Sequence, residues 1–204
     1  IPSLQLYADA TAKEVPFGLV PDALWGKPVI HVGAAKALAR IPDDDHMTNQ
    51  QRLHLNMKLE PSGAAKGTIK VWLKGIRAAM TRAYFRDMDP DTLREAARQS
   101  IQAAGYRGRG TLERGKTEGL SDTYEYAMQF EIDNFLRSGN TGAFMLTSIF
   151  GSPHDIMALA DIPDRPDSVR REACHGFHSW ETLELELPPG MELLSLPGEA
   201  QLKG

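Results

Sequence analysis

The sequence predicts an α+β domain with a mainly antiparallel, sandwich-like β-sheet and two helices inserted after the first hairpin. Three observations predict it: alternating apolar residues over 52–60, a second alternating run over 68–73, and helical periodicity from Ile76 onward. A period of two places one face of a strand in the core, whereas spacings of three and four do so for a helix. Strands and helices that segregate along the chain are typical of α+β architecture.

The first two long strands are expected to form a hairpin. The turn residues Pro61-Ser62-Gly63 separate the two alternating runs. The first strand should bury four apolar side chains, which are Leu53, Leu55, Met57 and Leu59. Two shorter strands are predicted ahead of this hairpin, one that ends at Asp9 and one over residues 29–32.

The first helix is predicted to begin near Ile76, where the period of the apolar residues changes. Its apolar residues are expected to face the core and its arginines to face water. The inward set is Ile76, Met80 and Ala83 or Tyr84, and the outward set is Arg77, Arg82 and Arg86.

The second helix has clear signals at both ends. Asp89 can cap its N-terminus, Pro90 suits the first helical position, and Gly105 is a typical C-terminal stop. The residues expected to face the core are Leu93, Ala96, Ala97, Ile101 and Ala104.

Strand patterns return after the second helix. Apolar residues alternate over 124–132 and again over 180–187, and an apolar run over 144–150 predicts a further strand. The intervening segment 153–173 is rich in Pro and Asp, with at most a short helix near 154–160.

Composition excludes several function classes. The 204 residues carry a net charge of −4, so the chain as a whole does not attract nucleic acid or anionic lipid. No stretch approaches the roughly 18–20 apolar residues of a membrane span. A single cysteine, Cys174, rules out an intramolecular disulfide. We find no motif for a cofactor and assign none.

Three polar clusters could suggest chemistry, and each has a simpler explanation. Cys174 with His175 and His178 could form a nucleophile–base pair or a metal cluster, but no second ligand pair with suitable spacing exists. The basic residues of 107–116 favour a solvated strand edge over a nucleic-acid site, because glutamates interrupt them. The acidic run 43–45 lacks the spacing of a calcium loop and predicts a linker.

The first 42 residues resemble the end of a bacterial transglutaminase-like core, of the cysteine protease superfamily. The resemblance lies in Asp9-Ala10-Thr11, which matches an Asp-x-Thr element, and in Phe17-Gly18, Val20-Pro21 and Gly26-Lys27 after it. It implies that Asp9 is the last member of a Cys-His-Asp triad, in which the carboxylate orients the histidine.

The remainder resembles the C-terminal β domain of large exported bacterial proteins with an uncharacterised N-terminal β domain and a transglutaminase core. Gly75, Ala78 and Arg82 match a Gly-x-x-Ala-x-x-x-Arg element, and residues 187–190 match a closing Leu-Pro-x-Gly. The resemblance divides the chain into 1–42, the tail of the core with a connector, and 43–204, a β-rich accessory domain.

The chain departs from the family pattern in one important way. The family nucleophile and base precede the aspartate, yet only eight residues precede Asp9 and none is Cys or His. Cys174 lies on the wrong side of Asp9 to be that nucleophile. We therefore expect a chain without catalytic activity of its own, although the parent protein would act on amide bonds through a cysteine acyl-enzyme.

Two functions remain as hypotheses. The first is a non-catalytic accessory domain that supports the transglutaminase-like core of its parent chain or binds a peptide, a glycan or a partner surface. The resemblance implies a periplasmic or exported location for it. The alternative is a free-standing envelope module that binds or scaffolds without a linked enzyme. No nucleic-acid partner, membrane span or metal is expected.

Overall fold

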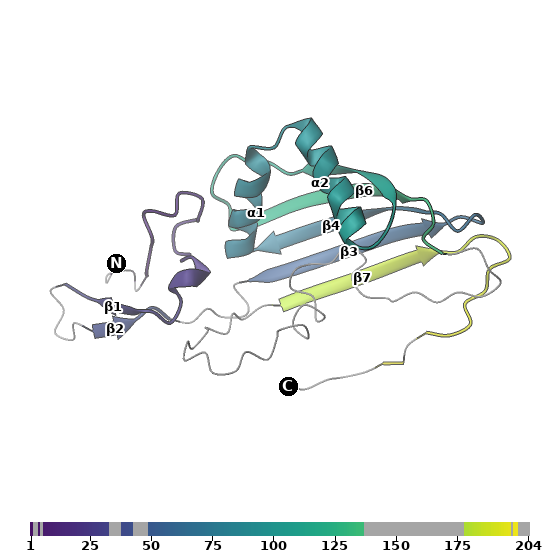
Figure 1. The fold of residues 1–204 in the computed structure, drawn as a ribbon. Coiled ribbons are helices and arrows are strands. Elements are labelled where there is room, and N and C mark those ends of the chain that lie inside the picture. Colours follow the sequence, from purple (N-terminus) through teal and green to yellow (C-terminus); the bar gives the residue numbers. More distant parts are fainter. Residues whose placement is uncertain are drawn as a thin grey trace, which may run out of the picture.

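A computed structural model describes residues 1, 4, 6–32, 38–42, 49–136, 178–196 and 198–199. Its long elements are a hairpin, then two helices, then three further strands (Figure 1). In chain order they are β3 (Gln50–Leu59), β4 (Ala65–Lys74), α1 (Ile76–Arg86), α2 (Pro90–Ala103), β5 (Gly108–Arg114), β6 (Thr123–Ile132) and β7 (His178–Glu186). Before them come a 3-10 turn, Asp22–Leu24, and the short strands β1 (Pro28–Ile30) and β2 (Leu38–Arg40).

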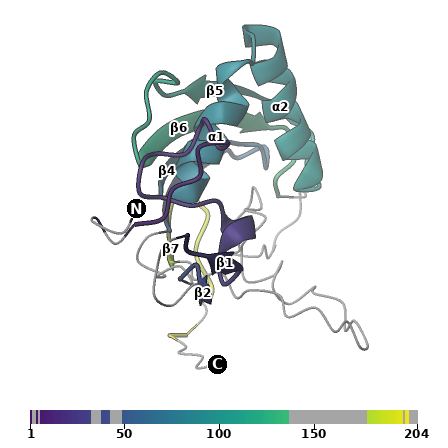
Figure 2. The same ribbon diagram turned by 90° about the vertical axis from the view of Figure 1, so that its left-hand side faces the viewer.

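The main sheet has five strands in the order β5-β6-β4-β3-β7. Three of the neighbouring pairs are antiparallel, and only β3 and β7 run parallel. Both helices lie on one face of this sheet (Figures 1 and 2). The predicted α+β fold, with two helices after the first hairpin, is therefore confirmed. Its sandwich-like description needs correction, because helices rather than a second sheet cover the buried face.

The core lies between the two helices and the covered face of the sheet. Period-two alternation along β3, β4 and β6 sends every second side chain to this face, as the sequence predicts. Large side chains from β3, β6 and α2 are buried there almost completely: Met57, Leu59, Ile101 and Ile132. At about 1.5–3 kcal/mol for each large apolar side chain, this burial is the main stabilising contribution.

The hairpin between β3 and β4 closes tightly. Glu60 donates its backbone N–H to the Ala64 carbonyl at 2.8 Å, and Gly63 has a φ of 86°. A Cβ at Gly63 would lie 2.3 Å from the Leu136 carbonyl oxygen, so glycine is required there by both conformation and space.

The buried face of α1 differs from the predicted one. Met80 and Tyr84 are 59% and 63% exposed, whereas Arg82 is only 3% exposed. The stripe that packs on the sheet is formed by Ile76, Ala78, Ala79, Arg82 and Phe85. The small alanines allow the helix to approach the sheet closely, and the guanidinium of Arg82 donates to backbone carbonyl oxygens. The prediction for Ile76 is therefore confirmed, whereas those for Met80, Tyr84 and Arg82 are wrong.

The second helix matches its prediction. Asp89 accepts a hydrogen bond from the Thr92 backbone N–H at 2.7 Å, and Pro90 is the first helical residue. Leu93, Ala97 and Ile101 are buried against the sheet.

The N-terminal segment is mostly irregular. The predicted strand ending at Asp9 is wrong, because residues 6–9 have no strand pairing and Asp9 instead begins a turn. The strand predicted over 29–32 is present as β1, which pairs antiparallel with β2. Trp25 and Ile41 are buried beside this small hairpin, and the Gly26 N–H donates to the Ile41 carbonyl at 3.1 Å.

Several sequence predictions lie outside the described residues. These are the strand over 144–150, the helix near 154–160, the linker 43–45, and Cys174 with His175. The domain boundary between residues 42 and 43 stays a prediction for the same reason.

Candidate binding face of the sheet

The face of the sheet opposite the helices carries polar, charged and aromatic side chains. These come from the even-numbered positions of β3, β4 and β7 and the odd-numbered positions of β5 and β6, as the register requires. We call this surface the open face. It is the surface on which the described residues bring together side chains from strands distant in sequence.

Two tryptophans and an arginine form a row across three strands of the open face. Arg52 of β3 is in register with Trp72 of β4 on one side and with Trp180 of β7 on the other. Its guanidinium carbon lies 5.0 Å from the centre of the Trp72 ring and 5.3 Å from that of Trp180. Both distances fall within the range of cation–π attraction. We call these three residues the Trp–Arg–Trp row.

A fourth side chain extends the row along β7. The His178 ring stacks on Trp180 with a centroid distance of 4.1 Å and an interplanar angle of 6°. Trp180 nevertheless remains 39% exposed. The row is thus an ordered aromatic surface with one large apolar side chain that solvent still reaches.

A shallow groove of about 690 Å³ runs beside the row. Arg52, Lys70, Trp72, Glu125 and Trp180 are among the residues that line it. Lys70 is in register with an alanine of β6, Ala127, and this small side chain leaves room at the middle of the sheet.

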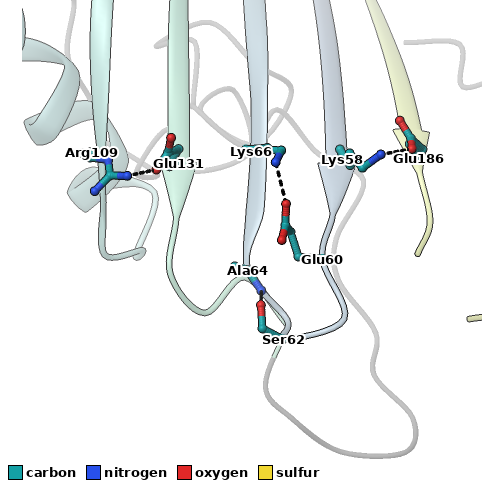
Figure 3. A network of polar contacts seen from close by, with 8 residues as sticks. All are labelled: Lys58, Glu60, Ser62, Ala64, Lys66, Arg109, Glu131 and Glu186. Atoms are coloured by element: carbon teal, nitrogen blue, oxygen red, sulfur yellow. Dashed lines mark hydrogen bonds and ion pairs between the residues drawn. The ribbon is translucent and has the colours of Figure 1, made fainter. Parts of the chain in front are cut away.

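Charges on the far end of the open face are paired. At the end next to the β3–β4 turn, Lys58 contacts Glu186, Arg109 contacts Glu131, and Lys66 lies 2.7 Å from Glu60 (Figure 3). The Lys66 hydrogen bond and charge lower the pKa of Glu60, and Glu60 raises the pKa of Lys66. Such exposed pairs contribute little to stability, but they leave few charges available to a partner.

Charges around Trp72 are arranged differently. Lys70, Trp72 and Lys74 follow one another on the open face of β4, with Arg52 beside them on β3. Within the described part of the chain, none of these three cations has a carboxylate within ion-pair distance. Glu125 is in register with Trp72 on the other side, and Glu113 of β5 lies beyond Ala127, so two carboxylates border the three cations on the β5–β6 side.

One histidine of the open face has an acidic neighbour. His54 lies 3.5 Å from Glu184, which also accepts a hydrogen bond from Asn56 at 3.0 Å. His54 occupies an even-numbered position of β3, so it lies on the open face.

Asp9, the residue expected from the resemblance to be catalytic, lies in the N-terminal segment and not on the open face. Its carboxylate accepts hydrogen bonds from the Thr11 backbone N–H at 2.8 Å and from the Thr11 hydroxyl at 2.6 Å. These bonds lower the pKa of Asp9. The Asp-x-Thr element is thus a local turn stabilised by its own side chains, and the triad role stays a prediction.

The segment that carries Asp9 is attached to α1 through Glu14. The Glu14 carboxylate lies 2.7 Å from the Arg86 guanidinium, and its carbonyl oxygen accepts a longer bond of 3.4 Å from Arg82. Nearby, burial lowers the pKa of Arg77 to about 10, which Asp22 partly opposes. Arg82 and Arg86 of α1 thus bind the backbone carbonyl and the carboxylate of Glu14, respectively.

The basic stretch over 107–116 forms the edge strand β5, as predicted. The exposed side chain of Arg114 reaches the end of α1, where its Nη1 donates to the carbonyl oxygens of Phe85 and Met88 at 2.7 Å each. A cation at this place satisfies carbonyls at the end of the helix and complements its dipole.

Within the described ranges, no group of three or more histidine, cysteine or acidic side chains could hold a metal ion. In the same ranges, no helix is long and apolar enough to cross a membrane. Sequence reasoning missed the Trp–Arg–Trp row, although tryptophans at the polar positions of two alternating strands were a signal.

No family model, curated protein or solved structure matches this chain. The fold and the open face therefore define it only as a β-rich α+β domain with an aromatic and cationic sheet surface.

Proposed function

We propose that this chain is a non-catalytic accessory module that binds a partner through the open face of its five-stranded sheet. The observation that carries the proposal is the Trp–Arg–Trp row, in which Trp180 stays exposed beside a charged groove. Tryptophan and arginine dominate the binding energy of many protein interfaces. A single exposed apolar side chain needs no explanation, but a contiguous apolar surface rimmed by polar residues marks an interaction site. Trp72, Trp180 and His178 together form such a surface around Arg52.

The size of the open face fits this role. Five strands about 4.8 Å apart and about 7–10 residues long span on the order of 600–800 Å². One side of a standard protein–protein interface buries about 800 Å². The open face could therefore supply one complete side of a specific interface.

We further propose that the parent protein contains a transglutaminase-like core, of which residues 1–42 are the tail. Support comes from the Asp9-Ala10-Thr11 element and the residues after it. The attachment of Glu14 to Arg82 and Arg86 gives the module a means to fix the direction of this tail. An exported location is part of the same proposal.

Two measurements test the accessory role. The purified chain should neither hydrolyse nor cross-link amide substrates, whereas the product of the full gene should do so and should lose activity on Asp9→Asn. A gene that encodes no Cys and His ahead of Asp9 would overturn the link to a core and leave the free-standing envelope module. Activity of the chain alone would overturn the non-catalytic role.

The binding role has its own test. The chain and its Trp72→Ser/Trp180→Ser variant would be immobilised and exposed to the separately purified remainder of the parent protein and to synthetic peptides. We expect binding to the original chain only. A matched control, Leu120→Ser, removes an exposed apolar side chain outside the sheet. Equal binding by the original chain and the double variant would exclude the open face as the site.

A further inference from the structure

We infer that the open face recognises a protein segment that presents carboxylate side chains next to apolar ones. This inference rests on the binding role proposed above and adds the chemistry of the partner. It depends on the uneven distribution of charge over the open face.

The two ends of the open face differ in how their cations are paired. Next to the β3–β4 turn, each lysine has a glutamate within reach, as Lys58 and Lys66 show (Figure 3). Around Trp72, the described residues provide no ion-pair partner for Arg52, Lys70 or Lys74. Cations that cluster without internal partners repel one another and gain most from an anion supplied by another molecule.

The cations around Trp72 indicate the charge of the partner and the geometry of its contacts. Arg52 is fixed between two indole rings, so its guanidinium is pre-organised to form two parallel hydrogen bonds with a carboxylate. Lys70 and Lys74 are two residues away from Trp72 on either side, on the same strand face. A segment with two or three acidic side chains could therefore contact all three cations while an apolar side chain rests against the tryptophans.

The acidic residues beside the groove set a limit on this partner. Glu113 already accepts a hydrogen bond from Gln129 at 2.7 Å, and Glu125 faces Trp72 from β6. These two carboxylates lie on the β5–β6 side of the groove. The acidic groups of the partner should therefore lie over β3 and β4, with neutral or basic groups over β6.

The shape of the surface favours a protein segment over an acidic glycan. Sites for small ligands are concave and enclose most of the ligand, whereas this groove is shallow and open to solvent. Arginine and tryptophan at the centre with charges around them are typical of protein interfaces.

The experiment uses the whole chain and two matched probe sets. The first set is an array of synthetic ten-residue peptides in which Asp or Glu alternates with Leu, Phe or Tyr, each with an Asn/Gln twin. The second set contains oligogalacturonides and neutral oligosaccharides of equal length. Binding is followed by tryptophan fluorescence at two salt concentrations.

We expect acidic peptides to bind at least about tenfold more tightly than their amide twins, and binding to weaken with added salt. Arg52→Gln, Lys70→Ala and Lys74→Ala should each weaken binding about fivefold or more. The control Lys66→Ala removes a cation that is already paired with Glu60 at the far end, so it should change affinity less than twofold.

Each contrary outcome has a defined meaning. Peptides that bind equally with and without charge would overturn the inference and leave the binding role standing. Binding of oligogalacturonides alone would overturn the choice of a protein partner. Peptides that bind without any effect of Arg52, Lys70 or Lys74 would overturn the assigned location. Failure of every acidic peptide, while the remainder of the parent protein still binds, would overturn the inference alone.

Discussion

Arg82 of α1 donates from Nη1 to the carbonyl oxygen of Ser121 at 2.7 Å, although the helix pattern predicts an arginine in water. A longer contact of 3.5 Å reaches the Thr123 carbonyl, and Nη2 reaches Glu14 at 3.4 Å. Arg82 therefore connects α1 both to the segment that leads into β6 and to the N-terminal segment.

Replacement of Arg82 by Ala should destabilise the domain strongly. Hydrogen bonds to a charged group contribute about 1.5–3 kcal/mol, and the buried carbonyls would lose their donor. We expect a loss of about 2–3 kcal/mol in the free energy of unfolding, measured by urea denaturation. Arg94, which is exposed and pairs with Asp91 on α2, is the control, and Arg94→Ala should cost less than about 0.5 kcal/mol. Equal effects of the two substitutions would contradict a structural role of Arg82.

Two glycines with the same backbone conformation should respond differently to alanine. Gly63 and Gly119 both have a φ of +86°, but a Cβ at Gly63 meets the Leu136 carbonyl and a Cβ at Gly119 meets nothing within 4 Å. Gly119→Ala should cost only the left-handed strain, about 1–2 kcal/mol. Gly63→Ala should cost about 1–3 kcal/mol more, because the hairpin must move away from Leu136. Thermal or urea unfolding of the two variants checks this. Similar losses in the free energy of unfolding would mean that the hairpin moves away from Leu136 at little cost.

The cap of α2 should show a defined pH dependence. The backbone N–H of Thr92, which donates to the ionised carboxylate, lowers the pKa of Asp89 below its usual 3.8. Because the folded pKa is depressed, the stabilisation is complete above pH 3.8 and is lost as the pH falls through the lower folded value. The denaturation midpoints of the original chain and Asp89→Ala should thus differ at pH 7 and converge in strong acid.

Asp87 provides the control for this measurement. Its side chain is 89% exposed and follows the end of α1. Asp87→Ala should leave the denaturation midpoint nearly unchanged at pH 7, where Asp89→Ala lowers it. A difference between Asp89→Ala and the original chain that persists at the same size in strong acid would contradict the capping role.

The Trp–Arg–Trp row should appear as an energetic coupling. In a double-mutant cycle, Arg52→Ala and Trp72→Ala should interact by about 0.5–1 kcal/mol, the range for exposed cation–π pairs. A second cycle with Lys66→Ala and Trp72→Ala is the control, because these residues lie six positions apart on β4 and should be additive within about 0.5 kcal/mol. Unfolding free energies measured by urea denaturation give both values. A coupling free energy no larger than that of the control would show that Arg52 and Trp72 lie close together without stabilising each other.

Local patterns predicted the elements well where the signal was complete within a few residues. Alternation over 52–60 and 124–132 identified strands and their buried faces, and Asp89 with Gly105 identified the ends of α2. The first helix shows the limit of this reasoning. Met80 and Tyr84 are more apolar than Arg82, but packing placed the two alanines and Arg82 inside.

The candidate site could not be predicted in the same way. Each member of the Trp–Arg–Trp row is visible in the sequence as a residue on the polar side of a strand. Their proximity depends on β7 pairing parallel to β3 across 128 positions of the chain. No local period encodes the partner of a strand.

The sequence by itself determined the α+β class, the hairpin, the second helix and the alternation of faces along each strand. These features follow from side-chain period, turn chemistry and capping, which act between near neighbours. Only the tertiary structure decided which side of α1 is buried, that Asp9 begins a turn instead of ending a strand, and that Arg52 meets two tryptophans. The physical reason is that strand order and register are fixed by the burial of one shared face, a property of the whole sheet.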